Sequence, residues 1–320
     1  AREIYVEKDG VLERTDVAFS DDVHLLEVIN RIVQSVGRRV DSSMPYVDAR
    51  LPDGSRVNAI IPPIALNGPV LTIRRFPKRF GSFSELVENG TISHEGADFL
   101  ERCVRLKLDI VVSGGSGSGK TTTLNVLSNS VASGERIIVI EDSSEISIKN
   151  HHVVYLESRP RNMEGKGEIT IRDLLRNALR MRPDRLIIGE CRGKETFDLI
   201  SAMNTGHEGC LSTVHANSSR DCLERILAMA LTAEEGIPVE VLQSWIAIGV
   251  DVVAHTMKTV SGKRVVSEIS VVGHDPSEGL CSCPVYFCEE GLTLQFPDWF
   301  VDKIGKQRAV DLAAVRKFGG

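Results

Sequence analysis

Residues 114–121 read Gly-Gly-Ser-Gly-Ser-Gly-Lys-Thr, and they directly follow the apolar run Leu-Asp-Ile-Val-Val-Ser at 108–113. The stretch fits the phosphate-loop pattern of Gly, four residues, Gly, Lys and Ser or Thr without a departure. Glycines let the backbone turn its N–H groups inward around a phosphate, at φ values that disfavour a Cβ. A helical pattern follows at 122–130, whereas a flexible Gly/Ser linker would not be expected between a strand and a helix. The stretch therefore predicts a binding site for a nucleoside triphosphate.

The residue types of this loop each have a chemical reason. Lys120 brings a positive charge to the β- and γ-phosphates, and Thr121 supplies a hydroxyl for Mg²⁺. The helix that begins here directs the positive end of its dipole at the anion. We therefore expect ATP or ADP with Mg²⁺, bound by the residues Gly114, Gly115, Ser116, Gly117, Ser118, Gly119, Lys120, Thr121 and Thr122.

Acidic residues follow two other strand-like runs. Residues 137–140 lead into Glu-Asp-Ser-Ser-Glu at 141–145, and residues 186–189 lead into Glu190. Ligands of open α/β sheets bind at the carboxyl ends of the strands, where an acid can hold Mg²⁺ or orient the attacking water. Solvated loop acids are the alternative, but two strand-end acids beside an intact phosphate loop favour a shared site.

Two histidines bracket the next strand-like run. His215 follows this run, where it could hydrogen-bond a γ-phosphate or a neighbouring acid, and a histidine satisfied within the core is the alternative. His207 precedes the run and is a weaker candidate, because it lies at the opposite end of the strand.

Composition limits the class of protein. The chain has 320 residues, 42% hydrophobic and 26% charged, which suits about two soluble domains. The net charge of −6 gives no overall attraction to nucleic acid. We find neither a run approaching the roughly 20 apolar residues of a membrane helix nor a secretory signal. Seven cysteines fit a reducing compartment, so we expect the cytoplasm. Because residues 2–7 are already strand-like, we expect the natural protein to be longer.

The element pattern predicts an α/β protein of two domains. Residues 1–76 form a small α+β domain, and turn formers without a sustained period indicate a linker at 77–90. Residues 91–320 alternate strands with helices, as βαβ units do, and an extension begins at about residue 274. In the small domain we expect strands at 4–6 and 17–19 across a turn at 8–10, followed by a helix at 22–36. Further strands are expected at 46–51, 56–61 and 70–76. In the large domain we expect further strands at 136–140, 185–188, 210–214, 252–257 and 264–272, and further helices at 94–107, 171–182, 194–204, 219–229 and 239–249.

Several segments resemble motifs of the secretion-ATPase superfamily, whose members drive type II and type IV secretion and type IV pili. Residues 141–145 resemble its Asp box, residues 176–193 its Walker B motif and residues 207–217 its His box. Residues 162–170 (Asn-Met-Glu-Gly-Lys-Gly-Glu-Ile-Thr) and 48–58 (Asp-Ala-Arg-Leu-Pro-Asp-Gly-Ser-Arg-Val-Asn) more narrowly resemble the CpaF-like ATPases of the tight-adherence (Tad) pilus. The likeness runs from about residue 2 to residue 273, with the motifs in the same order and spacing.

This resemblance implies a RecA-like P-loop ATPase domain preceded by a PAS-like amino-terminal domain, with ATP between them. It makes Glu145 the expected catalytic base, Glu190 the Walker B acid near the Mg²⁺ held with Thr121, and His215 a γ-phosphate or coupling residue. A planar guanidinium suits spread phosphate charge, and a surface ion pair is the alternative for any one arginine. The arginines expected to reach phosphates, from the same or an adjacent subunit, are Arg56, Arg74, Arg180 and Arg192.

The resemblance also implies partners and a place of action. We expect a homo-hexamer that works with platform proteins at the inner face of the cytoplasmic membrane, and that powers pilus assembly or retraction without binding nucleic acid. A nucleic-acid translocase on the same core is the first alternative, and the absence of a basic stripe interleaved with aromatics speaks against it. A non-enzymatic nucleotide-binding scaffold is the second, although Lys120, Thr121 and the strand-end acids are all retained. An LSGGQ-like signature of ABC transporters is absent from the sequence.

The last segment, 276–320, resembles no family motif that we recognise. Three of its cysteines, Cys281, Cys283 and Cys288, lie near His274 and could bind Zn²⁺. Because their spacing is irregular, free thiols are the expected state.

Overall fold

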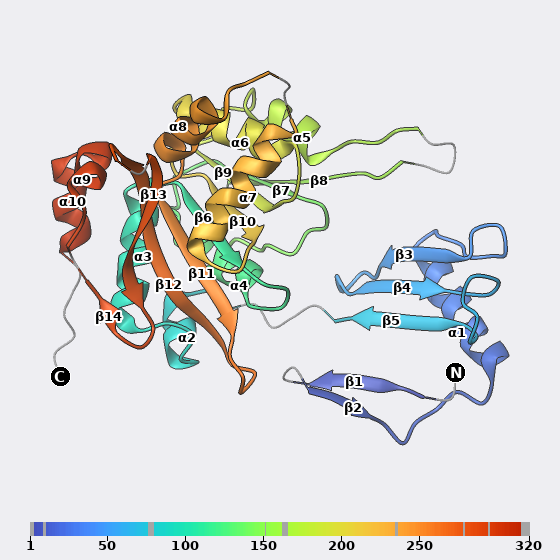
Figure 1. Ribbon diagram of the computed structural model, residues 1–320. Helices are drawn as coiled ribbons and strands as arrows, with labels where there is room; N and C mark the ends of the chain where they lie inside the picture. Colours follow the sequence, from blue (N-terminus) through green and yellow to red (C-terminus); the bar gives the residue numbers. More distant parts are fainter. Residues whose placement is uncertain are drawn as a thin grey trace. The chain divides into compact units, whose positions relative to one another are not determined.

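The computed structural model describes residues 3–8, 11–75, 80–150, 152–161, 166–233, 236–277, 279–293 and 295–314. The chain divides into two compact units, Ala1–Lys78 and Arg79–Gly320 (Figure 1). The larger unit contains the glycine-rich stretch and the acids and histidines that follow it in the sequence.

The first unit combines a two-stranded ribbon with a helix packed on a small sheet. The ribbon pairs β1 (Tyr5–Lys8) antiparallel with β2 (Val11–Arg14). Asp21 caps helix α1 (Asp22–Ser35) by accepting the N–H of His24. The antiparallel sheet runs in the order β3 (Tyr46–Arg50), β4 (Arg56–Ile60) and β5 (Val70–Arg74).

The core of this unit follows the two periods of its elements. Leu25, Ile29 and Val33 form the buried stripe of α1, and they cluster with Val47 of β3 and Ala59 of β4. The buried residues of β3 and β4 alternate with more exposed neighbours, as expected of a sheet with one covered face.

One element expected in this unit is wrong. The strand placed at 17–19 does not form, because β1 pairs instead with Val11–Arg14, only two residues further along the chain. Val11–Arg14 is the β-rich run that lies nearest to β1 in the sequence, and strands that follow one another along the chain commonly pair. Asp9, Gly10 and Phe76, which belong to the expected turn and last strand, lie outside the described residues.

The second unit is built on a nine-stranded mixed sheet of order β14-β13-β12-β11-β6-β10-β9-β7-β8 (Figure 1). The parallel part comprises β6 (Ile110–Gly114), β7 (Ile137–Glu141), β8 (Val153–Glu157), β9 (Arg185–Cys191), β10 (Leu211–His215) and β11 (Val252–Lys258). The antiparallel part comprises β12 (Arg264–Asp275), β13 (Gly279–Phe287) and β14 (Gly291–Leu292). Strands β6 and β7 are buried along their whole length, as expected of parallel strands covered on both faces.

Helices cover both faces of this sheet. Alternate residues of β6 point to opposite sides, so that Ile110 and Val112 enter one core and Val111 enters the other. The first core is closed by α2 (Phe83–Glu88), α3 (His94–Arg105), α4 (Lys120–Asn129), α9 (Asp298–Ile304) and α10 (Lys306–Ala313). The second is closed by α5 (Ile171–Ala178), α6 (Glu195–Asn204), α7 (Ser219–Leu231) and α8 (Val239–Gly249).

The segment expected as a linker, 77–90, contains helix α2. Ser82 and Glu85 form a capping box at its start, and Phe83 and Leu86 are buried in the first core. The helix has only six residues, too few for a period to show in the sequence. The strand β8 was also absent from the expected elements, although Asn150 and Pro160 flank its short run.

The tail is an integral part of the second unit. Strand β13 pairs along β12, and Trp299 of α9 packs so closely on Gly273 that a Cβ there would lie 2.4 Å from the indole ring. Cys281, Cys283 and Cys288 are free thiols. Across the described ranges no group of three or more His, Cys, Asp or Glu side chains could hold a metal ion. The described residues therefore do not form the Zn²⁺ site that was the alternative. Nor does any described helix combine the length and apolar character needed to cross a membrane.

Candidate functional site

The glycine-rich stretch forms a loop between β6 and α4, as its pattern predicts. Gly117 and Gly119 adopt φ values of 68° and 108°, in the region that favours glycine. Lys120 begins α4 and turns back over the loop, where its Nζ donates to the carbonyls of Gly114 at 3.0 Å and Gly115 at 2.7 Å. The ammonium group is therefore held by the backbone of the loop that it follows.

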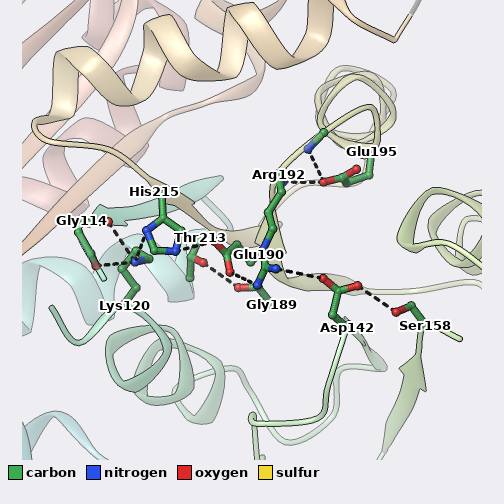
Figure 2. Close-up of polar contacts among 12 residues, drawn as sticks. Gly114, Lys120, Asp142, Ser158, Gly189, Glu190, Arg192, Glu195, Thr213 and His215 are labelled. Atoms are coloured by element: carbon green, nitrogen blue, oxygen red, sulfur yellow. Dashed lines mark hydrogen bonds and ion pairs between the residues drawn. The ribbon is translucent and has the colours of Figure 1, made fainter. Parts of the chain in front are cut away.

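Strand order brings three of the expected residues to one edge of the sheet. Strand β10 lies between β6 and β9, so the residue that ends β10 lies between the phosphate loop and the residues near the end of β9. His215 occupies that middle position: its Nδ1 is 3.3 Å from Nζ of Lys120, and its Nε2 is 2.8 Å from Oε1 of Glu190 (Figure 2). Thr213, two residues earlier, donates to the carbonyl of Gly189 at 2.8 Å and so ties β10 to β9.

Polar contacts continue from Glu190 toward β7 and β8. The guanidinium of Arg192 donates to Oε2 of Glu190 at 2.6 Å and lies 3.8 Å from Oδ2 of Asp142 (Figure 2). Asp142 in turn accepts the hydroxyl of Ser158 at 2.9 Å. The carboxyl edge of the sheet thus carries a row of polar and charged groups that begins at the phosphate loop.

The two glutamates of residues 141–145 have different environments. The carboxylate of Glu141 is buried and accepts the N–H groups of Glu145 at 2.9 Å and Ile146 at 3.1 Å, so it shapes the backbone of this segment. A Cβ at Gly189 would lie 2.8 Å from Cγ of Glu141, so glycine there admits the buried side chain. Glu145 itself is half-buried, and its negative charge helps raise the pKa of Arg192, after the stronger effect of the hydrogen bond to Glu190.

Burial and charge lower the pKa values of both bases in the row. Desolvation lowers the pKa of Lys120, and Arg192 lowers it further while Glu190 opposes the change. Desolvation, then the nearby Lys120, lower the pKa of His215, again with Glu190 opposing them. The imidazole is therefore neutral at pH 7, between an ammonium group and a carboxylate.

These residues fit a nucleotide with a divalent cation. Oε1 of Glu190 is buried and, within the described part of the chain, makes no hydrogen bond of good geometry, although Nε2 of His215 lies nearby. A carboxylate oxygen in that state suits a metal ion or a water bound to one. Thr121 is the second residue of α4 and directly follows Lys120.

Other expected residues are not gathered here. Arg180 follows α5 and precedes β9, so it lies at the opposite end of that strand from Glu190, with its side chain exposed. Arg56 and Arg74 are directly paired across β4 and β5 of the first unit, and Arg50 pairs with Arg56, which places three arginines in one row. Ser116 is exposed at the crest of the loop, and His207 lies before β10, at the other end of the strand from the row.

Two residues that contact the loop were missed. Thr256 of β11 has its hydroxyl oxygen 2.8 Å from Oγ of Ser118, and Arg264 of β12 donates its Nε to the carbonyl of Gly117 at 2.9 Å. The sequence indicated only a hairpin for their strands. The signal available was the polar pair His255 and Thr256 inside an otherwise apolar run.

Comparison with known proteins defines the class. A family model described as "Type II/IV secretion system protein" matches residues 1–276. A Mycobacterium tuberculosis protein, provisionally named for conjugal transfer, is 36% identical over 275 residues that cover 84% of this chain and 78% of that protein. The type IV secretion system protein VirB11 of Brucella abortus is 31% identical over 307 residues, covering 86% of this chain and 83% of VirB11.

Solved structures agree with this assignment. The VirB11 ATPase of the Brucella suis type IV secretion system, crystallised with sulphate, covers 86% of this chain and 90% of its own at 29% identity, with a TM-score of 0.50. The pilus retraction motor PilT with bound ADP matches 83% of this chain and 75% of its own at 21% identity, with a TM-score of 0.58, which shows a common fold.

The fold and the phosphate-loop edge define a nucleotide-binding α/β protein of the secretion-ATPase kind. The chain belongs to the type II/IV secretion system protein family, and it is an ATPase.

Proposed function

We propose that this ATPase is a hexameric motor that powers assembly or retraction of a Tad-type pilus, or transport by a related secretion system. The observation that carries the proposal is the row of contacts from Lys120 through His215 and Glu190 to Arg192, since it joins the phosphate loop to the ends of neighbouring strands. Such a row can respond to the loss of a γ-phosphate, because each member is charged or changes its hydrogen bond when its neighbour moves.

The proposed reaction is in-line attack of water on the γ-phosphate of ATP. Glu145 acts as the base that orients the water, and Glu190 with Thr121 would hold Mg²⁺ or the waters bound to it. Lys120 and the loop N–H groups stabilise charge on the transferred phosphoryl group. Mg²⁺ would supply positive charge that neutralises the charge developing on the phosphates.

In the proposed assembly each chain contributes its first unit, as a PAS-like domain, to nucleotide binding. The cross-strand arginines Arg50, Arg56 and Arg74 would supply positive charge suited to phosphates. Arg180 lies at the opposite end of β9 from Glu190, and it would contact the phosphates bound by an adjacent subunit. The ring would act at the cytoplasmic face of the inner membrane, against platform proteins of the pilus or secretion machine.

A nucleic-acid translocase is the second candidate. It is favoured by relatives named for conjugal transfer, among them TrbB of Rhizobium radiobacter, which is 29% identical over 251 residues that cover 77% of this chain and 74% of TrbB. The net charge of −6 disfavours a nucleic-acid track on this chain.

Turnover and oligomeric state together test the proposal. We expect Glu145→Gln and Glu190→Gln to lower kcat for ATP at least about a hundredfold while ATP still binds. Glu224→Gln is the matched control, because Glu224 is an exposed acid of α7 whose side chain is 70% accessible. Sedimentation with ATP should give a hexamer, and single-stranded or duplex DNA should leave kcat unchanged. A monomer with full activity would contradict the motor, and DNA-stimulated hydrolysis would favour the second candidate.

A further inference from the structure

A buried polar path joins strand β11 to the phosphate loop, on the side away from His215. Strands β11 and β10 flank β6 on opposite sides. Oγ1 of Thr256 lies 3.0 Å from the carbonyl oxygen of Ser113 and 2.8 Å from Oγ of Ser118. Oγ of Ser118 lies 3.0 Å from the carbonyl oxygen of Gly115. Because each hydroxyl carries one proton, two of these three contacts are hydrogen bonds at any one time. Thr256 and Ser118 are 1% and 3% exposed, so water does not compete for these contacts.

The backbones of β11 and the loop also approach unusually closely. Gly114, with φ of 152°, ends β6, and a Cβ at this position would lie 2.3 Å from the carbonyl oxygen of Thr256. Since real Cβ atoms do not come so near, glycine is required for the strand to reach the loop. The position at which the loop leaves the sheet is therefore set by Thr256 as well as by β6.

Strand β12, which forms a hairpin with β11, contacts the phosphate loop at Gly117. Arg264 is the first residue of β12, and its Nε donates to the carbonyl of Gly117 at 2.9 Å. Its stem lies beside Gly119, where a Cβ would be 3.7 Å from Cβ of the arginine. The carbonyl and the following N–H share one rigid plane, so this bond fixes the peptide between Gly117 and Ser118.

We propose that Thr256 and Arg264 are positioning residues for the nucleotide, through which the β11–β12 hairpin holds the phosphate loop in its binding conformation. The inference rests on the proposed hydrolysis of ATP at this loop. A preformed loop binds the nucleotide equally in the ground state and in the transition state, so its loss weakens binding more than turnover. Neither side chain takes part in the chemistry itself.

Substitutions that keep the side-chain volume and change only the hydroxyl test Thr256. Thr256→Val removes the hydroxyl with little change of volume, and Thr256→Ser keeps it. We expect Thr256→Val to raise the Kd for a fluorescent ADP analogue and the KM for ATP by about fivefold, with kcat within about twofold of the wild type. Thr256→Ser should restore both constants. Ser118→Ala should give a similar rise, and the double variant should lose less than the sum of the two single losses, because the two hydroxyls share one contact.

Arg264 is tested in the same binding assay. Arg264→Met keeps the stem beside Gly119 and loses the guanidinium, and we expect about a fivefold weaker binding of the ADP analogue. Lys263→Met, which removes an exposed charge one residue earlier in the hairpin, is the matched control and should bind as the wild type does.

The outcomes separate this inference from the proposed function. Unchanged Kd values in Thr256→Val and Arg264→Met, equal losses in Thr256→Ser and Thr256→Val, or a fall of kcat at unchanged Kd would each overturn the positioning role. If Thr256→Val does not fold, as judged by its thermal transition, Ser118→Ala and Arg264→Met carry the test. A wild type that binds the analogue but hydrolyses no ATP would contradict the proposed function, and the binding constants would still decide the roles of Thr256 and Arg264.

Discussion

Nε2 of His215 lies 2.8 Å from Oε1 of Glu190, at the carboxyl edge of the parallel strands. The distance follows from the sheet order, because β10 is inserted between the strand of the phosphate loop and the strand of Glu190. A side chain at the end of β10 is therefore the shortest connection between the two. The Nδ1 contact with Lys120 completes this connection on the other side of the ring.

His215 should therefore affect turnover. His215→Ala removes the hydrogen bond with the charged Nζ of Lys120 as well as the contact with Glu190. Loss of a hydrogen bond to a charged group costs about 1.5–3 kcal/mol, so we expect this variant to lower kcat by roughly ten- to a hundredfold. The measurement is steady-state release of phosphate. His207→Gln changes a histidine at the other end of the same strand and should keep kcat within about twofold. Equal losses in both variants would show that the effect is not specific to the Glu190 contact.

Arg192 should assist hydrolysis through the carboxylates that it contacts. Its guanidinium lies against Glu190 and within 3.8 Å of Asp142, with 62% of the side chain accessible. We expect Arg192→Ala to reduce kcat at least about tenfold, and Arg192→Lys to recover only part of it, because lysine cannot reproduce the planar fork. Arg220→Ala, at an exposed ion pair of α7, is the control. Full activity in Arg192→Ala would remove this arginine from the proposed site.

The stability of the second unit should fall with acid partly because of His255. This histidine is 8% exposed, and its Nδ1 lies 2.8 Å from the hydroxyl oxygen of Ser113. Desolvation lowers its pKa, while Glu268 and Asp221 oppose the change and Lys120 adds to it. The folded state thus binds fewer protons than the unfolded state, so stability is retained above the unfolded pKa of about 6.5 and is lost as the pH falls below it.

Urea unfolding at about pH 7.5, 6.5 and 5.5, values that bracket the ordinary histidine pKa, measures this dependence. We expect His255→Gln to lose less free energy of unfolding between the two lower pH values than the wild type does. His24→Gln, at an exposed position of the first unit, should keep the wild-type dependence. Identical slopes in the wild type and His255→Gln would contradict the assignment.

The tail should be needed for the stability of the ATPase unit. Nζ of Lys303 in α9 lies 3.0 Å from Oδ1 of Asp251 and donates to the carbonyl of Val272 at 3.1 Å, with only 14% of its side chain accessible. Removing one partner of a buried ion pair costs about 3–5 kcal/mol, so Lys303→Met should lower the free energy of unfolding by about this amount. Lys306→Met, at an exposed position of α10, should change it little. Equal values for both would mean that α9 is not anchored by Lys303.

The phosphate loop could be predicted because local chemistry dictates it. The glycines of the loop, the lysine that follows them and the acids after apolar runs can be recognised in the sequence. In the structure Gly117 and Gly119 have positive φ, and Lys120 begins a helix. The alternation of strands and helices likewise indicated a parallel sheet. That His215 would lie between Lys120 and Glu190 depended on the strand order, which no local pattern encodes.

The rest depended on contacts distant in sequence. Helices α9 and α10 are only seven and eight residues long. Helix α9 joins the core through Trp299 and Lys303, and α10 joins it through Ala309 and Leu312. The contacts of Thr256 with Ser118 and of Arg264 with Gly117 join residues 138 and 147 positions apart. Register between strands determines such contacts, and it is specified by tertiary packing.

Release of inorganic phosphate from ATP and Mg²⁺, measured for the wild type beside Lys120→Ala, tests the central claim most directly. Lys120 is held by the loop carbonyls in contact with His215, so its loss should remove both nucleotide binding and turnover. We predict steady release by the wild type and none above background by Lys120→Ala, with the same thermal transition in both apart from a small shift. Undiminished release by Lys120→Ala would contradict the assignment of this loop as the site of hydrolysis.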